Sequence, residues 1–441
     1  MKRLDRVKKR WIIVKTLHKS KIKTGALLCF TAIIALAGFM GVDHFRPDER
    51  VIKINGSADM TPVVTTVEKS IGTKAQAPEE GAVSGLVVDG KSALLMDAGS
   101  GAVLFEKNSH DRLPPASVTK IMTMLLVLEA VDRGQISLND MVTISERAAK
   151  MGGSQMYMEM GEQHSLEDLM KGIAMVSAND ACVAVAEYLG GSVEIFVEKM
   201  NRRAEKLGMK DTNFVNTNGL PVANHYCSAY DIAIMSRELI KHATCKEWFT
   251  TWQDTINIGL PGKEKEFGLT NTNRLIRQYP GADGIKTGFT QDAGYCLSGS
   301  ATRSDMTLIA VIMGSPTSQV RFNDISKMLD YGFATYDTVK IAEKGESTGN
   351  IRIEKGSLDL LNIVAGEDIS VLVKKGEKEG ITTGIELDKN IQAPIAKGQQ
   401  IGEIIVYEKA KEIERYPLVA EEKVEKASFG QLYIRMMKNL I

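Results

Sequence analysis

The chain has 441 residues, which is enough for two domains and flanking tails at about 100–200 residues per domain. Apolar residues make up 44% and charged residues 25%, an ordinary globular composition. Residues 1–23 carry ten Lys and Arg against one acid, so the zero net charge consists of a basic head (+9) and an acidic body (−9). That distribution argues against nucleic acid as a main partner.

An uncharged apolar stretch follows the basic head. Residues 25–42 approach the ~20 needed to cross a bilayer, and the preceding positive block orients the N-terminus towards the cytoplasm. Ala35-Leu-Ala37 resembles a signal-peptidase site, so the apolar stretch is either a cleaved signal peptide or a retained membrane anchor. A buried helix of a soluble domain is the alternative interpretation. We assign residues 1–42 to this export segment. Residues 43–85, which are polar and weakly periodic, are predicted to be a linker.

Residues 86–336 have the pattern of a mixed α/β domain. Apolar runs separated by turn residues predict a hairpin at 93–105, and helical periodicity dominates 118–131 and 166–207. Further strands are expected at 284–286, 295–301 and 307–313, followed by a closing helix at 319–334. Strands from both ends of the segment imply one sheet, flanked by helices.

The remaining residues predict a second domain and a tail. Short strands separated by Gly, Asp and Lys indicate a small all-β, sandwich-like domain at 337–424. Residues 425–441 predict an amphipathic helix whose apolar face comprises Phe429, Leu432, Tyr433, Met436, Met437, Leu440 and Ile441. Basic residues on the other face suit a helix lying in a membrane interface, and the alternative is a helix packed on its own domain.

The first chemical motif is Ser117-Val-Thr-Lys120, which follows Pro114-Pro-Ala and precedes an apolar run. Proline blocks an earlier helix, so Ser117 is expected at or near a helix N-terminus with Lys120 on the same face. Burial would lower the pKa of the lysine towards that of a general base. Alone, the motif also fits a capping serine beside a solvated lysine.

Two further motifs follow. In Ser177-Ala-Asn179, residues two apart point the same way in an extended loop, so both could face one cleft; capping of the next helix is the alternative. Lys286-Thr287-Gly288 reads as a strand with a cation and a hydroxyl for a carboxylate, and with a glycine that lets a substrate backbone approach. The alternative there is an exposed strand lysine before a turn.

The three motifs occur in order, 60 and 109 residues apart, as in penicillin-binding proteins and serine β-lactamases. About residues 90–441 resemble low-molecular-mass penicillin-binding proteins, specifically serine-type D-alanyl-D-alanine carboxypeptidases. The segments that carry this resemblance are 113–123, 177–182, 212–214, 218–221 and 286–295. It implies a DD-peptidase/β-lactamase-like catalytic domain with an antiparallel sheet.

The resemblance also implies roles for individual residues. Ser117 would be the acylated nucleophile and Lys120 its base, while Ser177 and Asn179 would serve proton transfer and substrate positioning. Lys286 and Thr287 would hold the terminal carboxylate, with Gly288 beside them. The backbone N–H groups of Ser117 and Phe289 would form the oxyanion hole, and Arg321 would support carboxylate recognition.

The implied reaction is removal of the terminal D-alanine from peptidoglycan stem pentapeptides through an acyl-enzyme, without metal or organic cofactor. β-Lactams would acylate Ser117, and the enzyme would act at the extracytoplasmic face of the bacterial membrane. Three alternatives remain open: a β-lactamase using Glu159 or Glu162, a DD-transpeptidase, and a catalytically silent wall-binding protein.

The four cysteines after the export segment are predicted to be free, buried thiols, because they show no pattern of a disulfide framework. The six histidines lack metal-ligand spacing, so a metal site is not expected.

Overall fold

The computed structural model of the protein describes residues 85–438. The predicted export segment lies outside these residues, as does nearly all of the predicted linker. Within residues 85–438, no helix is both long enough and apolar enough to cross a membrane. The chain divides into two compact units, of which the first runs to Ile341 and also includes Ser370–Glu379.

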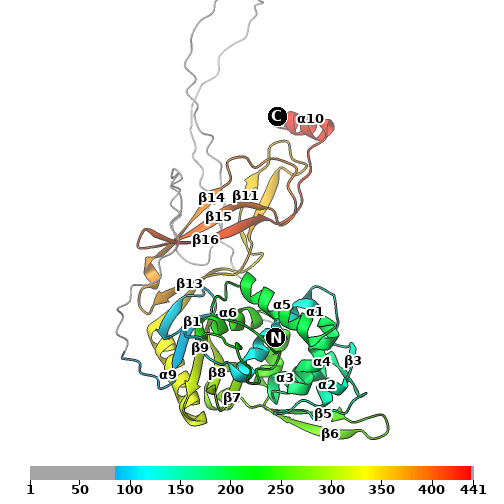
Figure 1. Cartoon of the computed structure of the whole chain (residues 1–441). Coiled ribbons are helices and arrows are strands. Elements are labelled where there is room, and N and C mark those ends of the chain that lie inside the picture. Colours follow the sequence, from blue (N-terminus) through cyan, green and yellow to red (C-terminus); the bar gives the residue numbers. More distant parts are fainter. Residues whose placement is uncertain (1–84, 439–441) are drawn as a thin grey trace, which may run out of the picture. The chain divides into compact units, whose positions relative to one another are not determined.

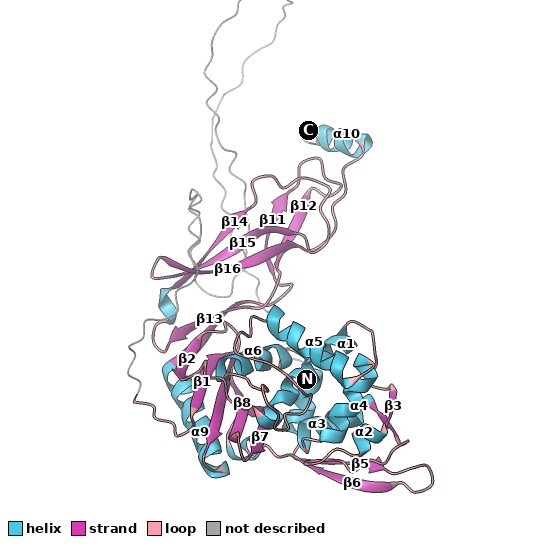
Figure 2. Ribbon diagram, in the orientation of Figure 1, coloured by secondary structure: helices cyan, strands magenta, loops and turns pink. Residues whose placement is uncertain are grey.

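The first unit is built around a five-stranded antiparallel sheet (Figures 1 and 2). Its strand order is β2-β1-β9-β8-β7, so β1 from the start of the unit pairs with β9 near its end, with Ala93 opposite Ile312. The bounds are β1 (Ser92–Asp97), β2 (Val103–Lys107), β7 (Ala282–Thr290), β8 (Gly294–Arg303) and β9 (Met306–Ser315). The expected sheet of distant segments is therefore confirmed.

Side-chain alternation gives this sheet two buried faces. Ala93 and Leu95 belong to one apolar cluster, which includes Phe322 and Ile325 of α9 (Ser318–Thr335). Leu94 and Met96, pointing the other way, belong to a larger cluster formed with the helical middle of the chain. The sheet thus lies between α9 and that helical layer, as Figure 1 shows.

The helical layer packs around α1 (Lys120–Asp132), which is buried along most of its length. Because α1 is apolar on all sides, it lies inside the layer rather than on its surface. The other helices are α2 (Glu146–Ala149), α3 (Leu166–Met175), α4 (Asn179–Gly190), α5 (Val193–Lys206), α6 (Ala229–Leu239), α7 (Thr244–Thr250) and α8 (Leu275–Gln278). Two small antiparallel strand pairs complete it: β3 (Met141–Thr143) with β4 (Gln163–Ser165), and the hairpin of β5 (Gln253–Ile258) with β6 (Lys265–Thr270).

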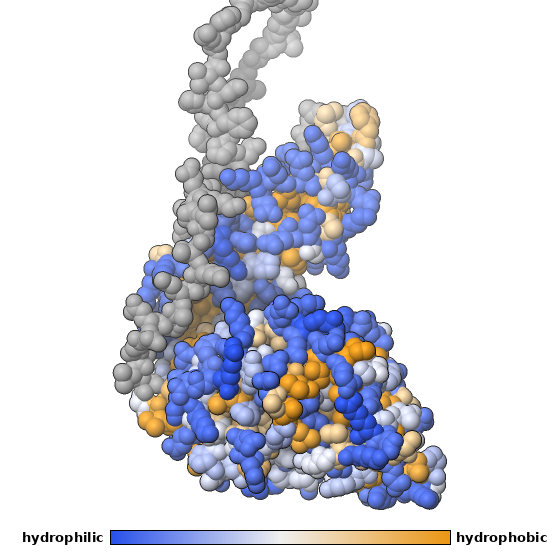
Figure 3. Space-filling view, in the orientation of Figure 1, coloured by the Kyte–Doolittle hydropathy of each residue, from blue (hydrophilic) through white to orange (hydrophobic). Residues whose placement is uncertain are grey.

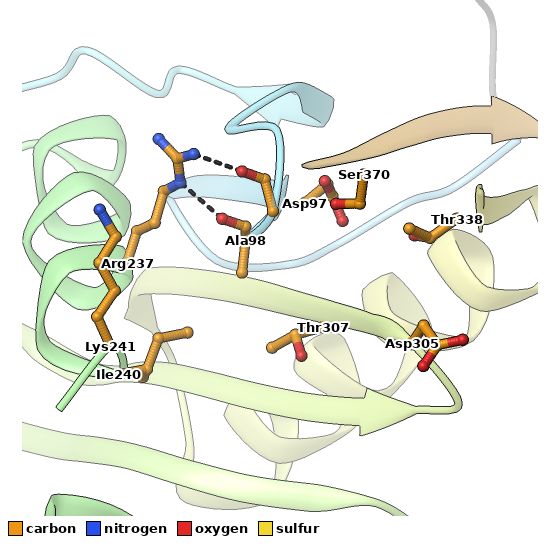
Figure 4. Close-up of a pocket in the computed structure, with 10 residues that line it drawn as sticks. Asp97, Ala98, Arg237, Ile240, Lys241, Asp305, Thr307, Thr338 and Ser370 are labelled. Carbon is orange, nitrogen blue, oxygen red and sulfur yellow. Dashed lines mark hydrogen bonds between the residues drawn. The ribbon is translucent and has the colours of Figure 1, made fainter. Parts of the chain in front are cut away.

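The turn after β1 is held by α6. Arg237 donates hydrogen bonds to the carbonyl oxygens of Ala98, at 2.6 Å, and Gly99, at 2.5 Å, beside a cavity of about 200 Å³ (Figure 4). Asp97 closes the same turn by accepting from the backbone and hydroxyl of Ser100. None of the predicted site residues lines this cavity, so the cavity is distinct from the candidate active site.

The second unit is an all-β structure followed by a helix. Its five-stranded sheet has the order β11-β12-β16-β15-β14, and the small pair of β10 (Tyr336–Ala342) and β13 (Ile369–Lys374) falls mostly in the first unit. The bounds are β11 (Ser347–Arg352), β12 (Leu360–Ala365), β14 (Ile381–Leu387), β15 (Gln400–Glu408), β16 (Lys411–Ala420) and α10 (Phe429–Lys438). The predicted fold class, including the terminal helix, is confirmed.

Candidate active site

Ser117 lies where the chain enters α1. It is part of the 3-10 turn η1 (Ala116–Thr119), which leads directly into α1 at Lys120. The residue before it, Ala116, has φ +48°, a conformation that L-residues rarely adopt. The Nζ atom of Lys120 is 2.9 Å from the Ser117 Oγ atom, so the two groups meet as their i, i+3 spacing predicts.

The Lys120 amine is completely buried and fully coordinated. Besides Ser117 it donates to Oδ1 of Asn179, at 2.7 Å, and to the carbonyl oxygen of Asn218, at 2.8 Å. Burial lowers the pKa of Lys120 to about 8, against the opposing effect of Cys182 and Asp180. The alternative of a solvated lysine is therefore wrong, and the lowered pKa allows a fraction of the amine to be neutral near pH 7, as a general base requires.

Ser177 and Asn179 lie where the chain enters α4, with Ser177 in the preceding loop and Asn179 as the first residue of the helix. Ser177 has φ +64° and is buried, and its hydroxyl has no hydrogen-bond partner among residues 85–438. Asn179 uses its other amide atom, Nδ2, to donate to the Gly152 carbonyl at 2.7 Å. The N-cap of α4 is Ala178, without a side-chain cap, so the capping alternative for this motif is wrong.

Lys286, Thr287 and Gly288 lie on the edge strand β7. Lys286 is buried, and its pKa is well below the usual value, first because of burial and then because of the Lys120 charge. A substrate carboxylate would favour its charged form. The Thr287 hydroxyl lies 2.8 Å from that of Thr272. Gly288 faces the Ser117 backbone: a Cβ atom there would be 3.1 Å from the Ser117 nitrogen.

Phe289 and Arg321 stand at the margin of this cluster. The Phe289 side chain is 51% exposed and lies against Tyr295, with ring centroids 4.3 Å apart. Arg321, from α9, is buried and donates through Nη1 to the carbonyl oxygens of Gly288 and Cys296, each at 3.1 Å. Arg321 thus binds the backbones of β7 and β8 behind the site.

Two contributors were not assigned a role from the sequence. The Asn218 carbonyl anchors the Lys120 amine, and Gly219, with φ +86°, packs against the nucleophile turn so closely that a Cβ would lie 1.8 Å from the Ala116 oxygen. In the sequence, residues 218–221 are singled out only by the family resemblance. A main-chain acceptor has no residue-type signature, whereas the Asn-Gly pair is a signal for a turn.

Glu162, the candidate base for a β-lactamase, has its carboxylate engaged in hydrogen bonds within the fold. Its carboxylate accepts from the Glu159 nitrogen at 2.6 Å and from the Gly259 nitrogen at 2.8 Å, and it lies 2.8 Å from His164 Nε2. These bonds tie the 151–164 loop to the end of β5. Glu162 therefore acts as a structural anchor in this arrangement.

The described cysteines, Cys182, Cys227, Cys245 and Cys296, are free and buried. Burial raises the pKa of the Cys182 thiol to about 12, although it lies close enough to Lys120 and Lys286 to feel both charges. A thiol held protonated is a poor nucleophile. Of the two groups near Lys120, the Ser117 hydroxyl is therefore a better candidate nucleophile than this thiol.

Comparison with known proteins gives matches along both units. Residues 75–317 match the family described as D-alanyl-D-alanine carboxypeptidase, peptidase S11, and residues 336–426 match the C-terminal domain of penicillin-binding protein 5. The chain is 43% identical over 355 residues to D-alanyl-D-alanine carboxypeptidase DacF of Bacillus subtilis strain 168, covering 80% of this chain and 90% of that one. It is 38% identical to DacC of Escherichia coli K12, covering 78% and 86%.

Among solved structures, penicillin-binding protein 5 from Haemophilus influenzae superposes with a TM-score of 0.65 at 36% identity. The match covers 78% of this chain and all of that one. Penicillin-binding protein 6B from Escherichia coli superposes with a TM-score of 0.59 at 31% identity, covering 80% and 99%.

Proposed function

This chain belongs to the D-alanyl-D-alanine carboxypeptidase family, and we propose that Ser117 is the nucleophile with which it carries out that reaction. It is a serine-type carboxypeptidase of the penicillin-binding class, acting on cell-wall peptidoglycan. One observation carries the assignment: a buried lysine with a pKa near 8 lies 2.9 Å from the only serine hydroxyl that shares its helical turn. That pair can generate an alkoxide-like nucleophile without further help.

In the first step the neutral Lys120 amine takes the Ser117 hydroxyl proton. The oxygen forms a bond to the carbonyl carbon of the penultimate D-alanine, and a tetrahedral oxyanion results. The bond from that carbon to the nitrogen of the terminal D-alanine then breaks. The Lys120 ammonium gives up the proton it took, and the nitrogen receives that proton through Ser177, whose hydroxyl is otherwise unpartnered among residues 85–438. Free D-alanine leaves an ester on Ser117.

In the second step water hydrolyses that ester. The water loses a proton to the base as its oxygen attacks the ester carbon, and Ser117 Oγ regains a proton as the bond to it breaks. The products are a peptide carboxylate and the free enzyme. β-Lactams enter the same first step, with the ring amide in place of the scissile peptide.

The remaining residues hold the substrate. Lys286 and Thr287 bind the terminal carboxylate, and the Ser117 and Phe289 N–H groups bind the oxyanion. Asn179 positions both Lys120 and the acyl side of the peptide. Arg321 supports carboxylate binding indirectly, because its guanidinium donates a hydrogen bond to the Gly288 carbonyl oxygen and thereby fixes the strand that carries Lys286 and Thr287.

The test is incubation with a pentapeptide ending in D-alanyl-D-alanine, followed by assay of free D-alanine. We expect release by the parent and none by Ser117→Ala, with both proteins equally folded. An added acceptor amine separates hydrolysis from transfer, and slow loss of bound penicillin separates a peptidase from a β-lactamase. No release by well-folded parent protein would contradict the proposal.

We also propose that α10 attaches the enzyme to the membrane surface. Phe429 is 87% exposed, and Tyr433, Ile434 and Met436 are exposed as well, so α10 leaves apolar side chains uncovered (Figure 3). Arg435 reaches back, to within 3.4 Å of the Ser357 carbonyl. A helix packed on its own domain would bury these apolar side chains.

Vesicle co-sedimentation tests the attachment. We expect the parent to pellet with anionic phospholipid vesicles and Phe429→Ser/Tyr433→Ser to remain in solution, while Gln431→Ala serves as the matched control. Release of D-alanine from a soluble pentapeptide should be equal in all three. Because the predicted export segment could also bind lipid, all variants carry a chain starting after residue 42; equal pelleting would contradict this role of α10.

A further inference from the structure

A buried histidine outside the three motifs is connected to the turn that carries Ser117. His225 Nε2 lies 2.8 Å from the Thr119 hydroxyl, and that hydroxyl donates to the Ala116 carbonyl oxygen at 2.8 Å. Both His225 and Thr119 are buried. The link therefore joins a loop more than a hundred positions away to the peptide group immediately before the nucleophile.

The direction of each hydrogen bond in this link is determined by its partners. The Val215 backbone N–H donates to Nδ1 of His225 at 3.0 Å, so Nδ1 is an acceptor and the imidazole proton sits on Nε2. Nε2 then donates to the Thr119 oxygen, and the single hydroxyl proton of Thr119 goes to the Ala116 oxygen. Burial lowers the pKa of His225 to about 4, so the imidazole is neutral at working pH.

Fixing the Ala116 oxygen also fixes the Ser117 N–H. The two belong to one planar trans peptide, in which C=O and N–H point in opposite directions. The Ser117 N–H is one of the proposed oxyanion donors. Moreover, a hydrogen bond accepted by the carbonyl polarises the amide and makes its N–H a stronger donor.

The orientation of the Ala116–Ser117 peptide group depends on hydrogen bonds from its surroundings. Ala116 has φ +48°, which L-residues rarely adopt, and Gly219 and Gly288 approach it from two sides without any side chain to bond it. The Thr119 hydroxyl supplies a side-chain hydrogen bond to the Ala116 oxygen, and His225 orients that hydroxyl.

We propose that His225, acting through Thr119, is a positioning residue that aims the Ser117 N–H at the oxyanion. It does not touch the substrate. The inference rests on the proposed function for the identity of the oxyanion hole, and it adds a residue that none of the three motifs contains.

Two substitutions test the roles of the two ring nitrogens of His225 separately. His225→Asn keeps an acceptor near the Nδ1 position for the Val215 N–H but removes the donor to Thr119. His225→Gln places an amide N–H near the Nε2 position and keeps that donor. Thr119→Val removes the hydroxyl at nearly constant shape, and Thr119→Ser restores it.

The main measurement is the infrared stretching frequency of the ester carbonyl in the acyl-enzyme formed with a β-lactam, which reports hydrogen bonding in the oxyanion hole. We expect a higher frequency in His225→Asn and Thr119→Val, and parent-like values in His225→Gln and Thr119→Ser. The acylation rate should fall about 10-fold or more in the first pair, with KM for the pentapeptide nearly unchanged. The double variant His225→Asn/Thr119→Val should lose no more than either single one.

Parent-like frequency and acylation in His225→Asn and Thr119→Val would overturn the proposal. So would equal losses in His225→Gln and His225→Asn, since the donor would then not be the active feature. A parent protein that forms no acyl-enzyme at all would instead contradict the proposed function, so the two failures are distinct.

Discussion

The Lys120 amine donates a 2.7 Å hydrogen bond to the Asn179 side-chain oxygen, although the two residues are 59 positions apart in the chain. The same amine lies 2.9 Å from the Ser117 hydroxyl, so Asn179 helps to orient the lysine amine towards that hydroxyl. A neutral amide leaves the lysine pKa under the control of burial. A charged group at position 179 would change that balance.

Asn179→Asp should therefore shift the pH profile of acylation upwards. A carboxylate at hydrogen-bonding distance favours the ammonium form, and such a partner raises a lysine pKa by about one unit or more. Acylation by labelled penicillin would be slower at pH 7 and would recover at higher pH. Asn179→Ala, the uncharged control, should lose activity without an upward shift; matching profiles in the two variants would show that charge is not the cause.

The parent enzyme should acylate faster as pH rises towards 8. Only neutral Lys120 can take the serine proton, and with a pKa of about 8 its neutral fraction grows about tenfold per pH unit below that value. The rate should level off above about 8. Stopped-flow acylation between pH 6 and 9, with tryptophan fluorescence as a control for folding, measures this. A rate independent of pH below 8 would argue against Lys120 as the base.

Gly219→Ala should damage both stability and acylation. A Cβ at this position would lie 1.8 Å from the Ala116 oxygen, and the residue has φ +86°, so the substitution combines a clash with an unfavourable conformation. We expect a loss of about 3 kcal/mol in the free energy of unfolding. Gly134→Ala is the matched control, because it has φ +65° with open space around it and should cost about 1 kcal/mol. Equal losses in urea unfolding would contradict the close packing of Gly219.

His225 should make the fold less stable in mild acid. Burial lowers its pKa to about 4, whereas an unfolded histidine titrates near 6.5, so between these values the unfolded chain binds the extra proton. The contribution is fully present above pH 6.5 and is lost as pH falls towards 4, amounting to about 3 kcal/mol. Urea unfolding at pH 7, 6 and 5 of the parent and His225→Gln isolates it. The variant should show the smaller decline, and identical slopes would refute the prediction.

Much of the site could be predicted because its chemistry is encoded locally. Ser117 and Lys120 meet through helical spacing, and Lys286-Thr287-Gly288 reads as a strand from its own residues. The helix α10 follows directly from its apolar period, and the two-unit fold follows from the change of pattern near Tyr336. The roles of the individual site residues remain proposals until the variants above are measured.

Other features left no comparable signal. The β5–β6 hairpin was not predicted, because its strands are largely polar and bury few apolar side chains, namely Ile256, Ile258 and Leu269. The anchoring of Lys120 by the Asn218 carbonyl is a main-chain contact that any residue could supply. The role of Glu162 depends on the Gly259 N–H, which folding brings within reach.

Sequence by itself determined which chemical groups are present and which of them share a turn or a strand. It also determined the apolar patterns that place Ser117 at the start of a buried helix. Tertiary structure decided the state of those groups. The pKa of Lys120 depends on desolvation by segments far along the chain, the proton on His225 depends on Val215, and the orientation of the Ser117 N–H depends on Thr119. Desolvation and hydrogen-bond direction are properties of packed surroundings, so they exist only once the chain has folded.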